Sequence, residues 1–455
     1  MGGLGRGEAL MNEKLRNVPG LERNGAAHTR GTVYVASCLV ADASTVFSPA
    51  ALAVENGVVV AAGPLADVER ETPARFDRVD LPGLAILPGL VNAHAHLSIP
   101  RLTDRDGAQA PSPLPFVEWI LRIVAWKRNA PPEEFANNVE AASREAVSNG
   151  TTGVGEIAGP DVAAYARCPL RAKVFVEGIG FDPEVAGTVV SSVEEAVARI
   201  DAFSRAGGRV APGISPHTLY TVGFALLQDL AQLAARLDLP LALHLAESPA
   251  EMEFLASGGG EVATRLYPAV GKDVSFFRGI GASIPSYLRS AGILREGLIL
   301  VHNVHLSRGD TDDLRTRGAT FVLCPRSNTA HQNGAPDVTH FVDAGIPFAL
   351  GTDSLGSVSS LSMWEEMRAA AGIYRGGLTG EELCRFLFQA ATENGARVLG
   401  LPSGTLATGA PADFVAIDDP GRGAGGWSFS RMVEKVGDRD VRLTVIAGER
   451  EHERL

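Results

Sequence analysis

The sequence is poor in cysteine and contains no long apolar run. Its four cysteines are widely separated and form no CxxC pair, so the sequence suggests neither a disulfide framework nor a thiolate metal site. The polar first thirty residues contain no apolar signal segment, and no stretch of eighteen apolar residues follows, which argues against a membrane span. We therefore expect a cytoplasmic protein in which residues 1–30 form a flexible extension.

Acidic residues outnumber basic residues, and this balance bears on the kind of partner that the protein binds. The chain has 41 lysines and arginines against 53 acidic residues, a formal net charge of −12, which gives no support for binding nucleic acid or an anionic membrane. A small-molecule substrate fits better. The 455 residues exceed the usual size of one hydrophobic core, so a large domain with a smaller companion is expected.

The two ends of the chain share one pattern. Short β-branched runs broken by Gly, Pro and Asp fill residues 32–84 and return after Gly404, in TLATGAPADFVAID and VRLTVIAGER. This pattern predicts small antiparallel strands, with no helix needed between residues 32 and 84. We expect the two ends, residues 31–84 and 404–455, to form one β-sandwich domain.

Residues 85–403 alternate short apolar runs with longer helical patterns. Eight candidate strands end at LVNAHAHL, TTGVGEI, AKVFVEGIG, VAPGISPH, PLALHLAE, LILVHNVH, TFVLCPRSN and PFALGTDS. Helical patterns separate them, among them residues 133–148, 193–204, 224–236 and 381–399. This rhythm predicts an α/β fold with a (β/α)8 TIM barrel, in which chemistry is located at the C-terminal ends of the strands.

Histidines gather at these predicted strand ends. His94 and His96 follow an apolar run, and the period of two along a strand points both imidazoles to one side, where both reach one ion. The alternative is a pair of partly exposed histidines without a ligand. Further strands end at His217, His244 and His302, and the last ends at Asp353. Because strand ends converge on one mouth of a barrel, these side chains are expected to meet there.

A site of three imidazoles and one carboxylate suits zinc, with iron as the alternative, and leaves room for water. We assign His94, His96, His244 and Asp353 as the ligands of one divalent ion. For His244 the alternative is a buried histidine bonded to a backbone carbonyl, and for Asp353 it is a helix N-cap.

Other polar residues near the strand ends are candidates for catalysis. Glu247, three residues beyond His244, is the candidate proton shuttle, although it could instead be a solvated glutamate at a helix start. His302 is a candidate for contact with the attacking water, and His217 for binding a substrate heteroatom. The histidines that end no strand are interpreted as structural or pocket-rim residues: His305, His331 and His340.

The strand-end motifs resemble a known family. LPGLVNAHAHL, SPHTLYT, HLAES, LVHNVHL, LCPRSN and LGTDS are similar to the nucleoside and cytosine deaminase branch of the amidohydrolase superfamily, which includes chlorohydrolases, over residues 32–450. The segments HLAES, IPSYLRSAGIL, CPRSN and GTDSLGSVSSLSMWEEMR most resemble aminodeoxyfutalosine deaminases of menaquinone biosynthesis.

This resemblance implies a distorted barrel plus a β-sandwich, and one zinc or iron ion on the four ligands above. It implies catalytic roles for Glu247, His302 and Asp353, and substrate contacts from His217, Ser327 and Asn328. Two-metal relatives carry a lysine at the end of the fourth strand, where this chain reads VAPGISPH, so one ion is expected. A homo-oligomer, specifically a dimer, is also expected.

One position departs from the pattern of the resemblance. Relatives often read HxHLEL after the metal pair, whereas this chain has Ser98 at the acidic position, which removes a possible ribose contact. Arginines are candidates to pair with a substrate carboxylate. They are Arg101, Arg105, Arg122 and Arg326.

The expected reaction is deamination of a 6-aminopurine nucleoside, first of all 6-amino-6-deoxyfutalosine. In this hypothesis an activated water attacks the amine-bearing carbon while Glu247 protonates the adjacent ring nitrogen. The alternatives are adenosine, methylthioadenosine or S-adenosylhomocysteine as substrate, or dechlorination of a triazine ring. A catalytically inactive binding protein would instead predict a broken ligand set, and this set is intact.

Overall fold

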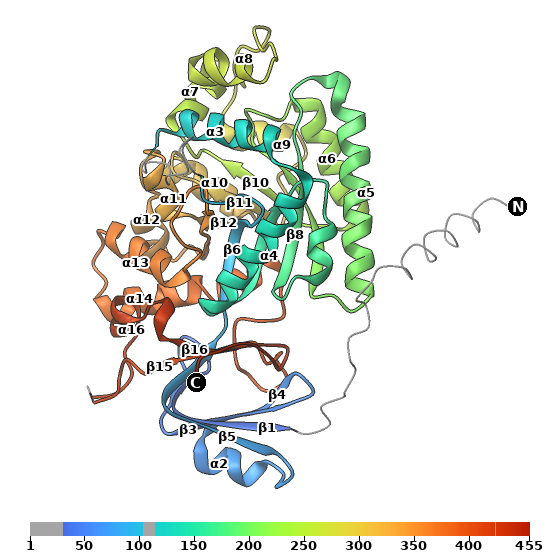
Figure 1. The fold of residues 1–455 in the computed structure, drawn as a ribbon. Coiled ribbons are helices and arrows are strands. Elements are labelled where there is room, and N and C mark those ends of the chain that lie inside the picture. The colour runs from blue at the N-terminus through green and yellow to red at the C-terminus, as the bar shows by residue number, and fades with distance from the viewer. Residues whose placement is uncertain (1–30, 103–113, 424) are drawn as a thin grey trace, which may run out of the picture.

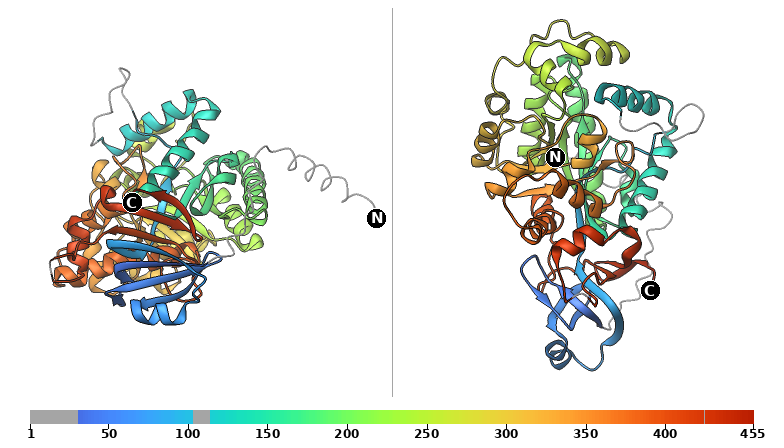
Figure 2. Two further views of the ribbon diagram at one scale, coloured as in Figure 1. Left: turned by 60° about the horizontal axis from the view of Figure 1, so that its bottom comes forward. Right: turned by 90° about the vertical axis from the view of Figure 1, so that its left-hand side faces the viewer.

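The computed structural model describes residues 31–102, 114–423 and 425–455. These residues contain two β-sheets (Figure 1). The predicted extension 1–30 and Arg105 lie outside these ranges. One sheet combines strands from both chain ends, and the other is built from the middle of the chain. The views in Figure 2 agree that the strands of the two chain ends lie together at one end of the molecule.

The smaller sheet has the order β17-β16-β15-β5-β1-β3-β4, with β2 paired to β1. Its strands are β1 (Thr32–Val40), β2 (Val46–Phe47), β3 (Ala50–Glu55), β4 (Val58–Pro64), β5 (Asp77–Pro88), β15 (Phe414–Asp418), β16 (Val441–Ile446) and β17 (Glu449–Glu453). Its core contains Leu52, Phe414 and Leu443, so side chains from both ends of the chain pack together.

The expectation of antiparallel strands without a helix is wrong in one part of this sheet. β1 pairs with β5 in parallel, and helix α2 (Leu65–Glu71) lies between β4 and β5. Parallel strands need a crossover rather than a tight hairpin. The strand pair β3–β4 and the helix α2 provide that crossover, and Val68 buries the apolar side of α2.

The second sheet is a TIM barrel of parallel strands. Its strands are β6 (Leu90–His96), β7 (Thr151–Ala158), β8 (Arg171–Gly178), β9 (Val210–Pro216), β10 (Leu241–Leu245), β11 (Leu298–His302), β12 (Thr320–Leu323), β13 (Phe348–Leu350) and β14 (Asp353–Ser354). All eight expected strands are present, and β13 and β14 are two pieces of the eighth. The barrel closes because β14 pairs in parallel with β6.

Helices connect and surround the strands. They are α3 (Phe116–Asn129), α4 (Pro132–Ser148), α5 (Ala186–Arg205), α6 (Phe224–Leu237), α7 (Pro249–Ser257), α8 (Tyr267–Ala269), α9 (Ile284–Ser290), α10 (Arg308–Thr316), α11 (Pro325–Ala330), α12 (Val338–Asp343), α13 (Met363–Ile373), α14 (Gly380–Ala390), α15 (Glu393–Leu399) and α16 (Phe429–Lys435). Short 3-10 helices are η1 (Ala163–Arg167), η2 (Pro183–Val185) and η4 (Asp438–Asp440), and η3 (Val262–Leu266) is a π-helix. The expected helix 381–399 is two helices, because Thr392 leaves the helical conformation at φ −134° and ψ −93°. Within the described ranges, no helix has the length and apolar character needed to cross a membrane.

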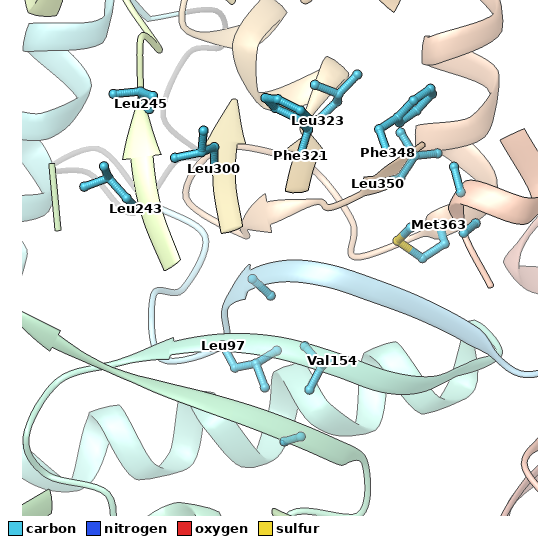
Figure 3. Close-up of a cluster of buried hydrophobic side chains, with 14 of the residues drawn as sticks. Leu97, Val154, Leu243, Leu245, Leu300, Phe321, Leu323, Phe348, Leu350 and Met363 are labelled. Atoms are coloured by element: carbon cyan, nitrogen blue, oxygen red, sulfur yellow. The ribbon is translucent and has the colours of Figure 1, made fainter. Parts of the chain in front are cut away.

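Alternation along the barrel strands separates two apolar faces. Leu243 and Leu245 of β10 pack in the core shared with the helices (Figure 3), whereas Ala242 belongs to the cluster on the opposite, inner face. His244 therefore points into the barrel. In β6 the register shifts between Asn92 and Ala95, so that Ala95 packs in the outer core, which leaves the flanking histidines on the inner side.

Candidate active site

The assigned ligands come together at the C-terminal ends of the strands. The Nε2 atoms of His96 and His244 lie 3.3 Å apart, and Oδ1 of Asp353 lies 3.6 Å from Nε2 of His96. Nε2 of His94 lies 3.8 Å from the same Oδ1. Tetrahedral zinc with bonds of about 2.0–2.1 Å would separate its ligand atoms by roughly 3.3–3.4 Å, so the observed spacing is close to that of a metal centre.

The donor atoms also have the chemical state that a metal requires. Nε2 of His94 is buried and has no hydrogen-bond partner among the described residues. Nδ1 of His244 donates to the carbonyl of His217 at 2.8 Å, so its Nε2 keeps a free lone pair. Burial lowers the pKa of His96 and His244 well below the usual value, which keeps both rings neutral. The residues present therefore fit a divalent ion.

Asp353 is oriented by two serines. Its Oδ2 accepts hydrogen bonds from Oγ of Ser327 at 2.6 Å and Oγ of Ser357 at 2.7 Å, which leaves Oδ1 toward the histidines. Burial alone would raise the pKa of Asp353, but its contacts with the histidines hold it well below the usual range. The alternative of a helix N-cap is wrong, since α13 begins ten residues later, with Ser362 at its N-cap position.

The backbone at the strand ends is unusual. His302, Asp353 and Ala246 have φ values of 74°, 63° and 50°, a left-handed region that residues other than glycine rarely adopt and that is enriched at functional sites. His302 follows the inward-facing Val301, so regular alternation would turn it outward. The left-handed φ interrupts that alternation, and its ring lies 5.5 Å from the ring of His94, centroid to centroid.

Glu247 is a buried acid beside the metal ligands. It is 5% exposed, so it is not the solvated glutamate of the alternative interpretation, and α7 begins only at Pro249. Its Oε1 accepts a hydrogen bond from Nδ2 of Asn333 at 3.2 Å, and its Oε2 lies 3.8 Å from Nε2 of His302. Burial, and after it the charge of Asp353, raises the pKa of Glu247 well above the usual value. A raised pKa makes the Glu247 carboxylate a stronger base, which suits a group that accepts a proton and returns it.

Ser327 and Asn328 support other site residues. Both side chains are fully buried at the start of α11. Ser327 donates to Asp353, and Nδ2 of Asn328 donates to Nδ1 of His302 at 3.0 Å, which leaves the proton of the His302 ring on Nε2, on the side of Glu247. This placement favours a role in orienting Asp353 and His302 over the substrate contacts that the resemblance implied.

His217 lies next to His244 with its ring centroid 5.2 Å away. Its Nδ1 is within hydrogen-bond distance of Oγ1 of Thr221, at 2.7 Å, and its Nε2 lies 3.6 Å from Oε1 of Glu177. The side chain is 23% exposed, which leaves it accessible to a substrate. Burial lowers the pKa of His217 to about 3, so it is neutral and can accept or donate one hydrogen bond.

Several site residues were missed by the sequence reasoning. Glu251 accepts hydrogen bonds from the backbone N–H groups of Ala246 and Glu247 and so fixes the turn that carries the acid. Asn92 accepts from the N–H groups of Thr352 and His94 and joins the first and last strands. Asn92 and Glu251 do not lie at the end of a strand, so the strand-end rule did not find them. The available signal for Glu251 was its spacing, four residues after Glu247.

The remaining histidines differ in their surroundings. Nε2 of His305 bonds to the carbonyl of Asn333 at 2.8 Å, and His340 lies on α12, 3.6 Å from Asp312. His331 is buried, and its ring packs on Trp119 with centroids 4.2 Å apart.

The arginines expected to bind a carboxylate are already paired. Arg101 bonds to Glu145, and Arg326 makes ion pairs with Glu365 and Glu366. Arg122 lies 4.0 Å from Glu118 on the same helix. Ser98, at the departing position, accepts a hydrogen bond on its backbone carbonyl from Asn138.

Comparisons with known proteins agree with this geometry. The model of the amidohydrolase family matches residues 85–450. The aminodeoxyfutalosine deaminase of Deinococcus radiodurans is 32% identical over 361 residues, 78% of this chain and 82% of that protein. The 5-methylthioadenosine/S-adenosylhomocysteine deaminase of Halobacterium salinarum is 30% identical over 410 residues, 87% of this chain and 86% of that protein.

Solved structures share the fold. The aminofutalosine deaminase of Helicobacter pylori, in complex with methylthio-coformycin, superposes with a TM-score of 0.78 at 20% identity over 92% of this chain and 99% of that one. An adenosine deaminase of Xanthomonas campestris with bound zinc gives a TM-score of 0.74 at 27% identity over 92% of each chain. The chain therefore belongs to the amidohydrolase family and is a hydrolase that acts on carbon–nitrogen bonds.

Proposed function

We propose that this protein is a metal-dependent aminohydrolase that removes the 6-amino group of a purine nucleoside. The observation that carries the proposal is the buried carboxyl group of Glu247, held by Asn333 beside His302 and facing the cluster of metal ligands. Hydrolytic deamination needs a group that moves a proton from water to a ring nitrogen, and a carboxyl group with a raised pKa serves that purpose.

The chain's own residues account for the proton steps. A divalent ion held by His94, His96, His244 and Asp353 would lower the pKa of a water molecule and favour its attack at neutral pH. Glu247 takes a proton from the attacking water and gives it to the ring nitrogen next to the amine-bearing carbon. The carbon–oxygen bond forms, and Glu247 then moves the second proton from the added hydroxyl to the amino group. The carbon–nitrogen bond breaks, ammonia leaves, and the added oxygen stays on the ring as a carbonyl. The Nε2–H group of His302 donates to the added oxygen.

We propose one zinc ion as the cofactor, with iron as the alternative. Three imidazoles and one carboxylate suit both metals, and zinc is bound in the adenosine deaminase from Xanthomonas campestris. A second ion bridged by a modified lysine is not expected, because β9 ends at Pro216 and contains no lysine.

The preferred substrate is 6-amino-6-deoxyfutalosine. The 32% identity to a deaminase of that name supports this choice, while the 30% identity to a methylthioadenosine and S-adenosylhomocysteine deaminase supports the alternatives. The favoured substrate carries a carboxylate remote from the purine, and that carboxylate needs a cation.

Lys127 is our candidate for that cation. It is exposed in the last turn of α3 and has no ion-pair partner among the described residues, unlike Arg101 and Arg326. Burial lowers the pKa of His217, and the positive charge of Lys127 lowers it further. Burial raises the pKa of Glu177, and the charge of Lys127 acts against that rise. A lysine that acts electrostatically on these two groups is suited to a carboxylate at the mouth of the site.

Product analysis tests the proposed reaction. Zinc-loaded protein is incubated with 6-amino-6-deoxyfutalosine, methylthioadenosine, S-adenosylhomocysteine, adenosine and a chlorinated triazine, and ammonia and chloride are measured. We expect ammonia from the nucleosides, with the highest kcat/KM for 6-amino-6-deoxyfutalosine. Chloride from the triazine without ammonia from any nucleoside would show a dechlorinase instead.

A further inference from the structure

His331 is a buried histidine whose ring nitrogens are both unpaired. It is 3% exposed, and neither Nδ1 nor Nε2 has a hydrogen-bond partner among the described residues. The backbone of Leu114 approaches the ring without hydrogen-bond geometry. Buried polar atoms are nearly always hydrogen-bonded, because an unmade bond costs about 1–3 kcal/mol. Two such atoms on one ring therefore point to a partner that binds during function.

The position of His331 connects it to the active site. Its backbone N–H donates to the carbonyl of Ser327 at 3.0 Å, so it lies one helical turn after Ser327, at the C-terminal end of α11. Ser327 bonds to Asp353, and the charge of Asp353 raises the pKa of His331 against the larger effect of burial. His331 therefore borders the metal centre on the Asp353 side.

Trp119 flanks the ring from the neighbouring helix. The two ring centroids lie 4.2 Å apart, and Nε1 of Trp119 donates to the carbonyl of Gly356, in the turn that follows Asp353. This contact fixes the indole and limits the movement of the imidazole. The two nitrogens are thus held at the edge of the site.

We propose that His331 is a specificity-determining residue that hydrogen-bonds a sugar hydroxyl of the nucleoside substrate. This inference rests on the proposed function. Glu247, His302 and the metal ligands serve the reacting end of the purine, and Lys127 is proposed for the remote carboxylate, so the sugar hydroxyls still lack an assigned partner. A hydroxyl group donates one hydrogen bond and accepts others, which matches the one donor and one acceptor of a neutral imidazole.

The ring stays neutral at physiological pH. Burial lowers the pKa of His331 to about 4. A neutral ring gives little preference for an anion, which separates this role from the carboxylate contact proposed for Lys127.

The test compares a nucleoside with its analogues that lack one sugar hydroxyl. Adenosine, 2′-deoxyadenosine and 3′-deoxyadenosine are assayed by kcat/KM with zinc-loaded wild type and His331→Leu. A site built to bond a hydroxyl leaves polar atoms unpaired with the deoxy analogue, so we expect wild type to prefer adenosine to one analogue by about 10- to 100-fold. In His331→Leu we expect that preference to fall below about 3-fold, with kcat/KM for the disfavoured analogue nearly unchanged.

Two further variants separate this role from a structural one. His331→Gln keeps a donor and an acceptor and should retain part of the preference, and it serves as the test if His331→Leu does not fold. His340→Leu removes a histidine that faces Asp312, outside the site, and should leave the preference as in wild type. Zinc content and melting temperature are measured for each variant.

Two results would overturn the inference alone: an unchanged preference in folded His331→Leu, or no preference in wild type that deaminates all three compounds. Failure of wild type to deaminate any purine nucleoside would overturn the proposed function, and this inference with it.

Discussion

Replacing Glu247 by glutamine isolates the proton transfer from metal binding. Glutamine has nearly the same shape, and its amide oxygen can still accept the hydrogen bond from Nδ2 of Asn333 that now reaches Oε1 at 3.2 Å. The substitution leaves the four metal ligands in place, and also the hydrogen bonds that the backbone N–H groups of Ala246 and Glu247 donate to Glu251. It removes only the ability to accept and return a proton.

The expected loss follows from this single missing step. General acid–base catalysis by a placed side chain contributes about 10²- to 10⁴-fold. Because Glu247 is buried and no other carboxylate lies within 4.0 Å of His302 among the described residues, we expect the loss in kcat to reach the upper end of that range. KM should change little, since no ground-state contact is lost.

The assay follows ammonia release in wild type and Glu247→Gln, each with metal content measured on the same sample. Glu253→Gln is the matched control: Glu253 lies on α7, two residues beyond Glu251, and its side chain is exposed. A kcat within about 10-fold of wild type in metal-bound Glu247→Gln would refute the assignment of the proton shuttle.

Three further outcomes follow from the structure. Lys127→Met should lower kcat/KM for 6-amino-6-deoxyfutalosine by about 10-fold and leave methylthioadenosine unaffected, as measured by steady-state kinetics; equal losses on both would contradict the carboxylate contact. Ser357→Ala removes one of the two hydroxyl groups on Asp353 and should weaken zinc binding by about 10- to 100-fold in a chelator competition. Burial raises the pKa of Glu366 from 4.5 to about 8, so the folded state binds the proton more tightly, and stability is lost as pH rises through this window. Denaturant titrations at several pH values should show that the free energy of unfolding falls less steeply with rising pH in Glu366→Gln than in wild type. The two slopes should differ by up to about 1.4 kcal/mol per pH unit.

The barrel and the ligand cluster could be predicted because each metal ligand lies at the end of an apolar run that is recognisable in the sequence as a strand. His94, His96, His244 and Asp353 each follow an apolar run, and the topology of a parallel barrel brings such positions to one mouth. The structure places their donor atoms within ligand spacing of one another. Their roles in catalysis stay predictions, as do the expected dimer and the boundaries of the domains.

Other features depend on contacts between distant segments and leave no local pattern. Asn333 reaches Glu247 from 86 positions further along the chain, and no spacing rule connects them. His302 takes its orientation from a left-handed φ that a short apolar run does not reveal. His331 was interpreted as a structural or pocket-rim residue because it ends no strand, and its sequence does not show that its N–H bonds to the carbonyl of Ser327 at the end of α11.

Departures from the expected secondary structure have local physical causes. The parallel pairing of β1 with β5 follows from the crossover through α2, whose short sequence LADVERE buries one valine. The break between α14 and α15 occurs at Thr392, whose hydroxyl donates to the carbonyl of Phe388 and offers the backbone an alternative to continuing the helix.

The most direct test of the central claim is a metal titration of the reaction itself. Metal-free protein is supplied with increasing zinc, and ammonia release from 6-amino-6-deoxyfutalosine is measured at each ratio. A single-ion aminohydrolase predicts a rate that rises linearly and stops rising at one zinc ion per chain. A rate that needs a second ion, or no ammonia at any ratio from this or any other 6-aminopurine nucleoside, would contradict it.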